Sequence, residues 1–115
     1  MHELALSEDI VREAVHACGE RASKMTALAV QVGALSSASP SALEFCLRAV
    51  LDEHGLTQTR ACVACVPALV RCVCGHRYQA EDMFAPCPRC GQYTRDILQG
   101  RDVVIQYVEV EDGED

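Results

Sequence analysis

The sequence is poor in aromatic residues. It has two Phe, three Tyr and no Trp among 115 residues, although half of the residues are hydrophobic. At about 25 cal/mol per Å² of buried apolar surface, a core made mainly of Ala, Val and Leu is marginal for one small domain. A bound metal ion would help to hold a segment that cannot pack by itself.

An excess of positive charge is also absent. Ten Lys and Arg stand against 17 Asp and Glu, which gives a formal net charge of −7. Sequence-independent binding to DNA or RNA requires clustered Lys and Arg at the phosphates. The composition therefore argues against nucleic acid as a partner.

Targeting and catalytic signals are missing too. The first residues have no basic segment before a long apolar run, and no apolar stretch reaches the ~20 residues of a membrane span. We therefore expect a cytoplasmic protein that makes no membrane contact and whose thiols stay reduced. No Ser-His-Asp order, phosphate-binding glycine loop or H-E-x-x-H motif is present, so we expect no enzyme activity.

The hydrophobic pattern predicts two amphipathic helices and three strands. Ser7 is expected to cap the first helix, and Ser39 the second, which starts at Pro40 and ends at Gly55. In chain order, the predicted elements are a helix over 8–23, a strand over 26–35, the helix from Pro40, and strands over 60–66 and 103–110.

This order predicts an α/β (α+β) fold with two helices packed on a three-stranded sheet. Residues 68–99 interrupt the order, follow no hydrophobic period and offer almost no core. We expect residues 1–67 plus 100–115 to form the main α/β domain, and residues 68–99 to form an inserted zinc-ribbon-like module.

The insert contains two pairs of cysteines, each followed by a glycine. The pairs are Cys72-Val73-Cys74-Gly75 and Cys87-Pro88-Arg89-Cys90-Gly91. Two thiolates two or three positions apart can reach one ion when the chain turns tightly, and the glycine permits such a turn. The four thiolates would form a closed tetrahedral zinc site, which leaves no open position for catalysis.

Other residues could replace one ligand, because the first pair is C-x-C and not the usual C-x-x-C. Within reach along the sequence are His76, Cys65 and Cys62. Cys62 and Cys65 form a C-x-x-C of their own, but residues three apart in a strand point to opposite faces and make a poor chelate.

Taken in order, several short motifs resemble the HypA/HybF family, the nickel-insertion proteins of NiFe-hydrogenase maturation. They are Met1-His2-Glu3-Leu4, Val32-Gly33-Ala34-Leu35-Ser36, Val66-Pro67, the two cysteine pairs, Ile97-Leu98-Gln99-Gly100-Arg101 and Val108-Glu109-Val110. The resemblance covers essentially the whole chain.

The resemblance implies a nickel-binding α/β domain (1–67 plus 100–115) that carries an inserted zinc-binding domain (68–99). Such proteins deliver Ni(II) to the hydrogenase large subunit together with a maturation GTPase, and some also serve urease and its accessory proteins. The chain would be a monomer or a homodimer. It departs from the family at the C-x-C pair, and it lacks an acidic residue that some members place near Ser39.

The chain start has the chemistry of a nickel site. The Met1 amine, the His2 amide and the His2 Nδ1 can form two fused chelate rings, and Glu3 can add its backbone amide or its carboxylate. Ni(II) accepts nitrogen and oxygen donors in square-planar or octahedral geometry. The predicted nickel ligands are therefore Met1, His2 and Glu3.

A zinc-ribbon adaptor for nucleic acid or transcription machinery is the alternative function. The insert has four Arg against three acidic residues, an excess of one positive charge. So small an excess is too little to drive binding to phosphates.

Overall fold

The computed structural model describes residues 2–82 and 84–111, and the chain folds into two compact units. The described residues of Met1–Gln31, Ala38–Ala64 and Val104–Asp115 form the first, here called the helical unit. Val32–Ser37 and Cys65–Val103 form the second, the cysteine unit. The expected division into a nickel-binding and a zinc-binding domain stays a prediction.

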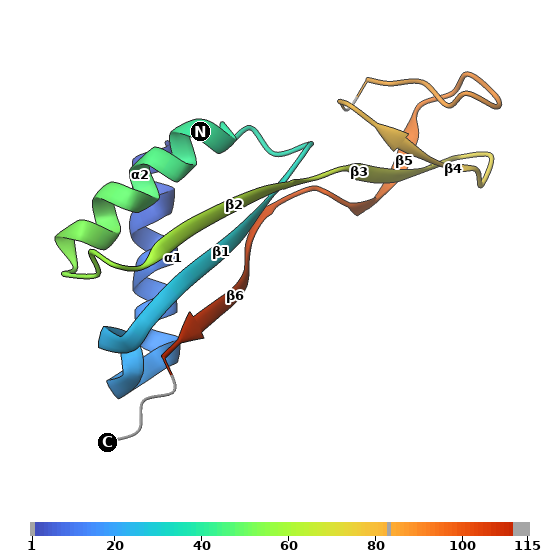
Figure 1. The fold of residues 1–115 in the computed structure, drawn as a ribbon. Helices are drawn as coiled ribbons and strands as arrows, with labels where there is room; N and C mark the ends of the chain where they lie inside the picture. The colour runs from blue at the N-terminus through green and yellow to red at the C-terminus, as the bar shows by residue number, and fades with distance from the viewer. Residues whose placement is uncertain (1, 83, 112–115) are drawn as a thin grey trace. The chain divides into compact units, whose positions relative to one another are not determined.

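Two α-helices, one 3-10 helix and two three-stranded sheets make up the described chain. Figure 1 shows their arrangement, and the predicted mixed α+β class is confirmed. The strand orders are β2-β1-β6 and β4-β3-β5. No described helix is long and apolar enough to cross a bilayer. In chain order the elements are α1 (Glu3–Cys18), the 3-10 helix η1 (Gly19–Lys24), β1 (Met25–Gly33), α2 (Pro40–Glu53), β2 (Arg60–Val66), β3 (Ala68–Cys72), β4 (Arg77–Ala80), β5 (Thr94–Gln99) and β6 (Val103–Val110).

Helix α1 starts at Glu3, which is earlier than the sequence analysis expects, and Ser7 is not its cap. His2 occupies the N-cap position, while Ser7 is buried within the helix. The Ser7 Oγ has no hydrogen-bond partner among the described residues. An acidic residue at the start and the helix formers at positions 4–6 extend the helix toward the N-terminus. Ser7 then falls on the same face as Ile10 and becomes part of the buried stripe.

The prediction for α2 is confirmed. The Ser39 Oγ accepts a hydrogen bond from the Ala42 amide at 3.3 Å, and Pro40 is the first helical residue. Gly55 follows the C-cap with a φ of 77°, a left-handed conformation that glycine adopts without strain. The expected apolar face is buried: Leu43, Leu47, Val50 and Leu51.

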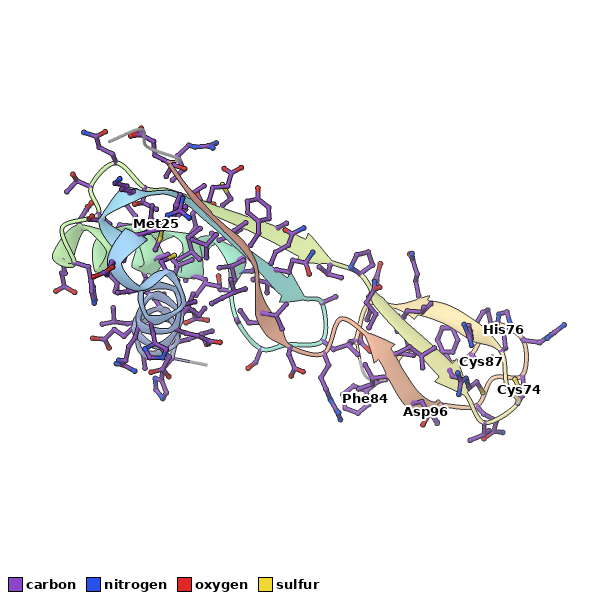
Figure 2. The ribbon with its side chains drawn as sticks, turned by 90° about the horizontal axis from the view of Figure 1, so that it is seen from below. Met25, Cys74, His76, Phe84, Cys87 and Asp96 are labelled. Carbon is purple, nitrogen blue, oxygen red and sulfur yellow. The ribbon has the colours of Figure 1, made fainter. Side chains whose placement is uncertain are left out.

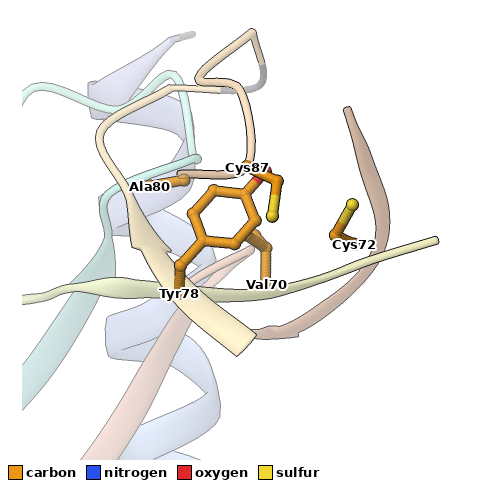
Figure 3. Close-up of a cluster of buried hydrophobic side chains, with 5 residues drawn as sticks. All are labelled: Val70, Cys72, Tyr78, Ala80 and Cys87. Atoms are coloured by element: carbon orange, nitrogen blue, oxygen red, sulfur yellow. The ribbon is translucent and has the colours of Figure 1, made fainter. Parts of the chain in front are cut away.

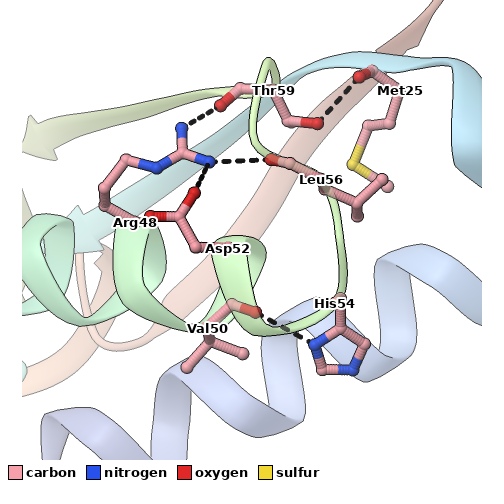
Figure 4. Close-up of polar contacts among 7 residues, drawn as sticks. All are labelled: Met25, Arg48, Val50, Asp52, His54, Leu56 and Thr59. Atoms are coloured by element: carbon pink, nitrogen blue, oxygen red, sulfur yellow. Dashed lines mark hydrogen bonds and ion pairs between the residues drawn. The ribbon is translucent and has the colours of Figure 1, made fainter.

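Arg48 fastens the end of α2 to the loop that leads into β2 (Figure 4). Its guanidinium donates to the backbone oxygens of Thr59 and Leu56, the latter at 2.7 Å, and pairs with Asp52 at 2.8 Å. The Thr59 hydroxyl donates to the Met25 carbonyl at 2.8 Å. These bonds satisfy polar groups beside a buried apolar core, where unpaired groups would be costly.

The cysteine unit has a small core of its own, so the expectation of almost no core is wrong. Strand β3 pairs antiparallel with β4, which places Val70 opposite Tyr78 and Ala68 opposite Ala80. The buried cluster consists of Val70, Cys72, Tyr78, Ala80 and Cys87 (Figure 3). Every second residue of β3 is buried, as expected for a strand that has one face covered by the core.

Two glycines of the cysteine unit, Gly33 and Gly100, lie where the backbone passes close to itself. The Gly33 amide donates to the Asp102 carbonyl at 3.0 Å, and the Leu35 amide donates to the Gly100 carbonyl at 2.9 Å. A Cβ on Gly33 would stand 2.2 Å from the Gly100 carbonyl oxygen. Only glycine permits this approach, and Gly100 also has a φ of 88°.

Candidate metal centre

The first cysteine pair lies at the turn between β3 and β4. Cys72 is the last residue of β3 and is 1% exposed, whereas Cys74 lies in the turn and is exposed. The Cys72 amide donates to the His76 carbonyl at 2.9 Å, and the Gly75 amide donates to the Cys72 carbonyl at 2.9 Å. This turn lets a C-x-C spacing present two sulfurs to one point.

The second pair forms a turn closed by backbone hydrogen bonds. The Gly91 amide donates to the Cys87 carbonyl at 2.9 Å, and the Cys87 amide donates to the Gln92 carbonyl at 2.7 Å. The Arg89 amide points at the Cys87 sulfur, with 3.4 Å between N and Sγ. Backbone amides directed at a sulfur stabilise its thiolate form, which is the form that binds metal.

The four sulfurs converge in the cysteine unit, where Figure 2 labels Cys74 and Cys87. All four Sγ atoms lie within 4.8 Å of one another. The Cys72–Cys90 distance is 3.2 Å and the Cys74–Cys87 distance is 3.9 Å, so each close contact joins one cysteine from each pair. With zinc–sulfur bonds of about 2.3 Å, tetrahedral sulfurs lie about 3.8 Å apart. The donor set and its spacing fit a zinc ion.

The thiols influence one another's ionisation. Burial acts to raise the pKa of Cys87, but the amides of Cys90 and Arg89 and hydrogen bonds from neighbouring thiols lower that pKa to about 7. The Gln92 amide lowers the pKa of Cys90, but the neighbouring thiols, first Cys72, together with desolvation, raise that pKa to about 12. Thiols this close together do not all lose their protons easily, because the resulting thiolates repel one another. A bound divalent cation would offset that repulsion with its own positive charge.

The three alternative ligands are not members of this cluster. The His76 ring stacks on the Tyr78 ring, with 6.2 Å between centroids and 12° between planes. On β2, Cys62 is half-buried and Cys65 is exposed. Within the described part of the chain, the four-thiol cluster is the one group of three or more metal-binding side chains.

At the chain start, the structure describes two of the three predicted nickel ligands, and Met1 lies outside the described residues. His2 is exposed, and its carbonyl accepts the first helical hydrogen bond, from the Leu6 amide at 3.0 Å. The Glu3 Oε2 accepts a hydrogen bond from the Ser39 backbone amide at 2.8 Å. That bond lowers the pKa of Glu3, and the Glu3 amide and His2 lower it further. The Ser39 contact could not be predicted from the sequence, because the donor is a backbone amide, which every residue except proline has.

Comparison with known proteins identifies the family. The model described as "Hydrogenase/urease nickel incorporation, metallochaperone, hypA" matches residues 1–110. The hydrogenase maturation factor HypA of Geotalea uraniireducens is 32% identical over 112 residues, which cover 96% of this chain and 100% of that protein. The HypA of Picosynechococcus sp. is 33% identical over 113 residues, with 96% and 99% covered.

Solved structures agree in fold. The solution structure of the Ni metallochaperone HypA from Helicobacter pylori matches with a TM-score of 0.64 at 17% identity, covering 96% of this chain and 97% of that chain. A second solution structure, of HypA protein, matches with a TM-score of 0.60 at 20% identity and 96% coverage of both chains. The resemblance inferred from the short motifs is thus confirmed, and the family is one of metallochaperones, not of enzymes. With its family model matched from residue 1 to residue 110, this chain belongs to the HypA family of nickel metallochaperones for hydrogenase maturation.

Proposed function

We propose that this chain carries Ni(II) on its N-terminus and delivers it to the large subunit of a NiFe hydrogenase. The observation that carries the proposal is the extent of the family match. It begins at residue 1 and ends at residue 110, so it includes the Met-His-Glu start and both cysteine pairs. Nickel is the cargo in this proposal, and zinc is the resident metal.

The nickel site would use Met1, His2 and Glu3. The amine and the His2 amide and imidazole give fused five- and six-membered chelate rings, a nitrogen-rich set that suits Ni(II). His2 is exposed and precedes the first turn of α1, so the site is open to a partner. A carrier requires such access, since it must give up the ion.

The zinc site would use Cys72, Cys74, Cys87 and Cys90. Four thiolates complete the tetrahedron, so zinc there would be structural and would activate no water. Two of these cysteines are also part of the apolar cluster of the cysteine unit. Zinc would therefore hold the pairs together and complete the packing around Tyr78. We infer that the chain is not an enzyme.

The proposed partners are the maturation GTPase of the nickel-insertion pathway and the hydrogenase large subunit, with urease accessory proteins as a further client. All three would be met in the cytoplasm, where thiolates stay free to bind zinc. Binding to nucleic acid is not favoured, because one of the four Arg of the insert is already paired. Arg71 lies 3.5 Å from Asp96 across β3 and β5.

A nickel titration tests the proposal. The zinc-loaded protein with its native N-terminus is compared with His2→Ala and with a version carrying extra residues before Met1. Each change should weaken Ni(II) binding at least about tenfold, or about 1.4 kcal/mol, with unchanged zinc content. The extension converts the amine into an amide, so it isolates that donor from the imidazole. Nickel affinity that survives both changes would place the cargo site elsewhere in the chain.

A further inference from the structure

The first turns of the two helices are joined through one hydrogen bond. Helix α1 begins at Glu3 and helix α2 begins at Pro40. The Ser39 backbone amide donates to the Glu3 Oε2 at 2.8 Å, although the two residues lie 36 positions apart. The start of α1 accordingly lies beside the first turn of α2 (Figure 1).

Ser39 makes two separate contacts with different atoms. Its side-chain oxygen caps α2 by accepting from the Ala42 amide at 3.3 Å. Its backbone amide belongs to the N-cap position, which precedes the hydrogen-bonded turns, so no carbonyl of α2 is available to it. The amide is therefore free to hold Glu3, and the cap keeps that amide at a defined place.

The acceptor is well matched to this donor. A carboxylate accepts shorter and stronger hydrogen bonds from an amide than a neutral oxygen does. Negative charge is also stabilised near the N-terminus of a helix, and Glu3 lies at two such termini, its own and that of α2. The two helices also pack against each other, and each buries an apolar side chain completely, Val11 on α1 and Leu43 on α2.

We propose that Ser39 is a positioning residue for nickel: its backbone amide holds the Glu3 carboxylate and thereby the His2 end of α1. The inference rests on the terminal nickel site proposed above. Of the two donors that Glu3 offers to nickel, this leaves only the backbone amide, because its carboxylate is a tether to α2 and not a metal ligand. Chain ends fray unless they are tied down, and a frayed end must be ordered before it can chelate.

Four single variants and one double variant separate the tether from a ligand. Glu3→Ala removes the acceptor, and Glu3→Gln keeps a carbonyl oxygen that can accept from Ser39. Ser39→Pro removes the amide hydrogen at a position whose φ of −84° lies near the range of proline. Ser39→Ala removes the hydroxyl cap but keeps the amide. The double variant combines Glu3→Ala with Ser39→Pro.

Ni(II) affinity is measured on the zinc-loaded proteins by competition with a chelator. Glu3→Ala and Ser39→Pro should each weaken Ni(II) binding by about tenfold. Because both changes break the same contact, the affinity of the double variant should lie within about twofold of the weaker-binding single variant. Glu3→Gln should recover most of the loss seen in Glu3→Ala, and Ser39→Ala should bind at least about fivefold more tightly than Ser39→Pro. The absorption bands of the saturated nickel complex should be the same in all variants, because the donor atoms do not change.

Several results would overturn the tether. Equal losses in Glu3→Gln and Glu3→Ala, with shifted nickel bands, would make the carboxylate a ligand. Wild-type affinity in Ser39→Pro would show that the amide does nothing for nickel. Should Ser39→Pro lose zinc or helix content, the comparison of Glu3→Ala with Glu3→Gln decides alone. His2→Ala runs beside these variants: if it binds nickel like the wild type, the terminal site itself has failed, and otherwise only the tether is in question.

Discussion

Different interactions stabilise the two units of this protein. In the helical unit the largest fully buried side chains are four leucines: Leu28, Leu43, Leu47 and Leu51. In the cysteine unit the buried cluster has one large aliphatic residue, Val70, and includes Cys72 and Cys87. The first unit is stabilised by burial of apolar surface, whereas the second combines a few apolar contacts with the proposed metal cross-link. Removal of the metal should therefore destabilise the cysteine unit, and removal of a buried apolar side chain should destabilise the helical unit.

Removal of a zinc ligand should give the largest effect. Cys87→Ala should abolish stoichiometric zinc binding and open the cysteine unit, because structural zinc contributes on the order of 10 kcal/mol in small domains. Hydrogen exchange should then show lost protection in β3, β4 and β5 and retained protection in α1 and α2. Cys65→Ala, at an exposed cysteine outside the cluster, is the matched control. Unfolding of both units together would mean that they do not differ as described.

A cavity in the helical unit should have the next largest effect on stability. Leu47 is 0% exposed, and Leu47→Ala should lower the free energy of unfolding by about 2–5 kcal/mol with unchanged zinc content. Phe45, on the same helix, is 76% exposed, and Phe45→Ala should change that free energy by less than about 0.5 kcal/mol. Denaturant titrations followed by circular dichroism at the helix bands measure both. A similar loss in the two variants would contradict the burial assigned to α2.

A side chain added at a crowded glycine of the cysteine unit should have a smaller effect on stability. In Gly100→Ala the new Cβ would lie 2.7 Å from the Ala68 Cα, at a φ of 88°. We expect a loss of about 2–4 kcal/mol, the sum of left-handed strain and a clash with backbone. Gly55→Ala has a similar φ of 77° but open space around the Cβ, so it should cost only about 1 kcal/mol. If thermal unfolding ranks the two equally, the close approach at Gly100 is not a constraint.

Acid should weaken the contact between the helix starts, and this is the smallest expected effect. The pKa of Glu3 lies below its ordinary value of 4.5, mainly because of the Ser39 amide. The folded state thus binds fewer protons there, so the contribution is complete above pH 4.5 and is lost as the pH falls through the lowered pKa. The unfolding midpoints of the wild type and Glu3→Gln should differ at pH 6 and converge as the pH falls toward 3. A constant difference across that range would mean that the Glu3 charge has no part in the contact.

Much of the helical unit could be predicted from residue patterns. Ser39-Pro40 and Gly55 mark the ends of α2, and β2 and β6 have the bounds that alternation predicts. These features depend on interactions within a few residues along the chain, which sequence records directly. The start of α1 could not be predicted in this way, because Ser7 looks like a cap. Whether a serine caps a helix or lies inside it depends on the apolar face next to it.

The core of the cysteine unit could not be predicted, for a different reason. Over residues 68–99 as a whole, Cys, Gly, Pro and Arg interrupt the hydrophobic period, so the short alternation of Ala68, Val70 and Cys72 does not stand out. In the structure, Cys72 and Cys87 both face the cluster that contains Tyr78 and also present sulfur to the metal site. One side chain can serve both purposes, because a thiol is small and apolar on the side that does not bind metal.

The sequence by itself determined the family and the four cysteines, since both depend on which side chains are present, and nickel binding by the first three residues stays a prediction from it. Tertiary structure alone decided which cysteines approach one another across the two pairs and that Ser39 holds Glu3. Both outcomes follow from backbone geometry: two turns bring Cys72 to Cys90, and helix packing brings an amide of one first turn to a carboxylate of the other. Backbone groups are the same in every residue, so their long-range partners are set by the folded chain and not by residue type.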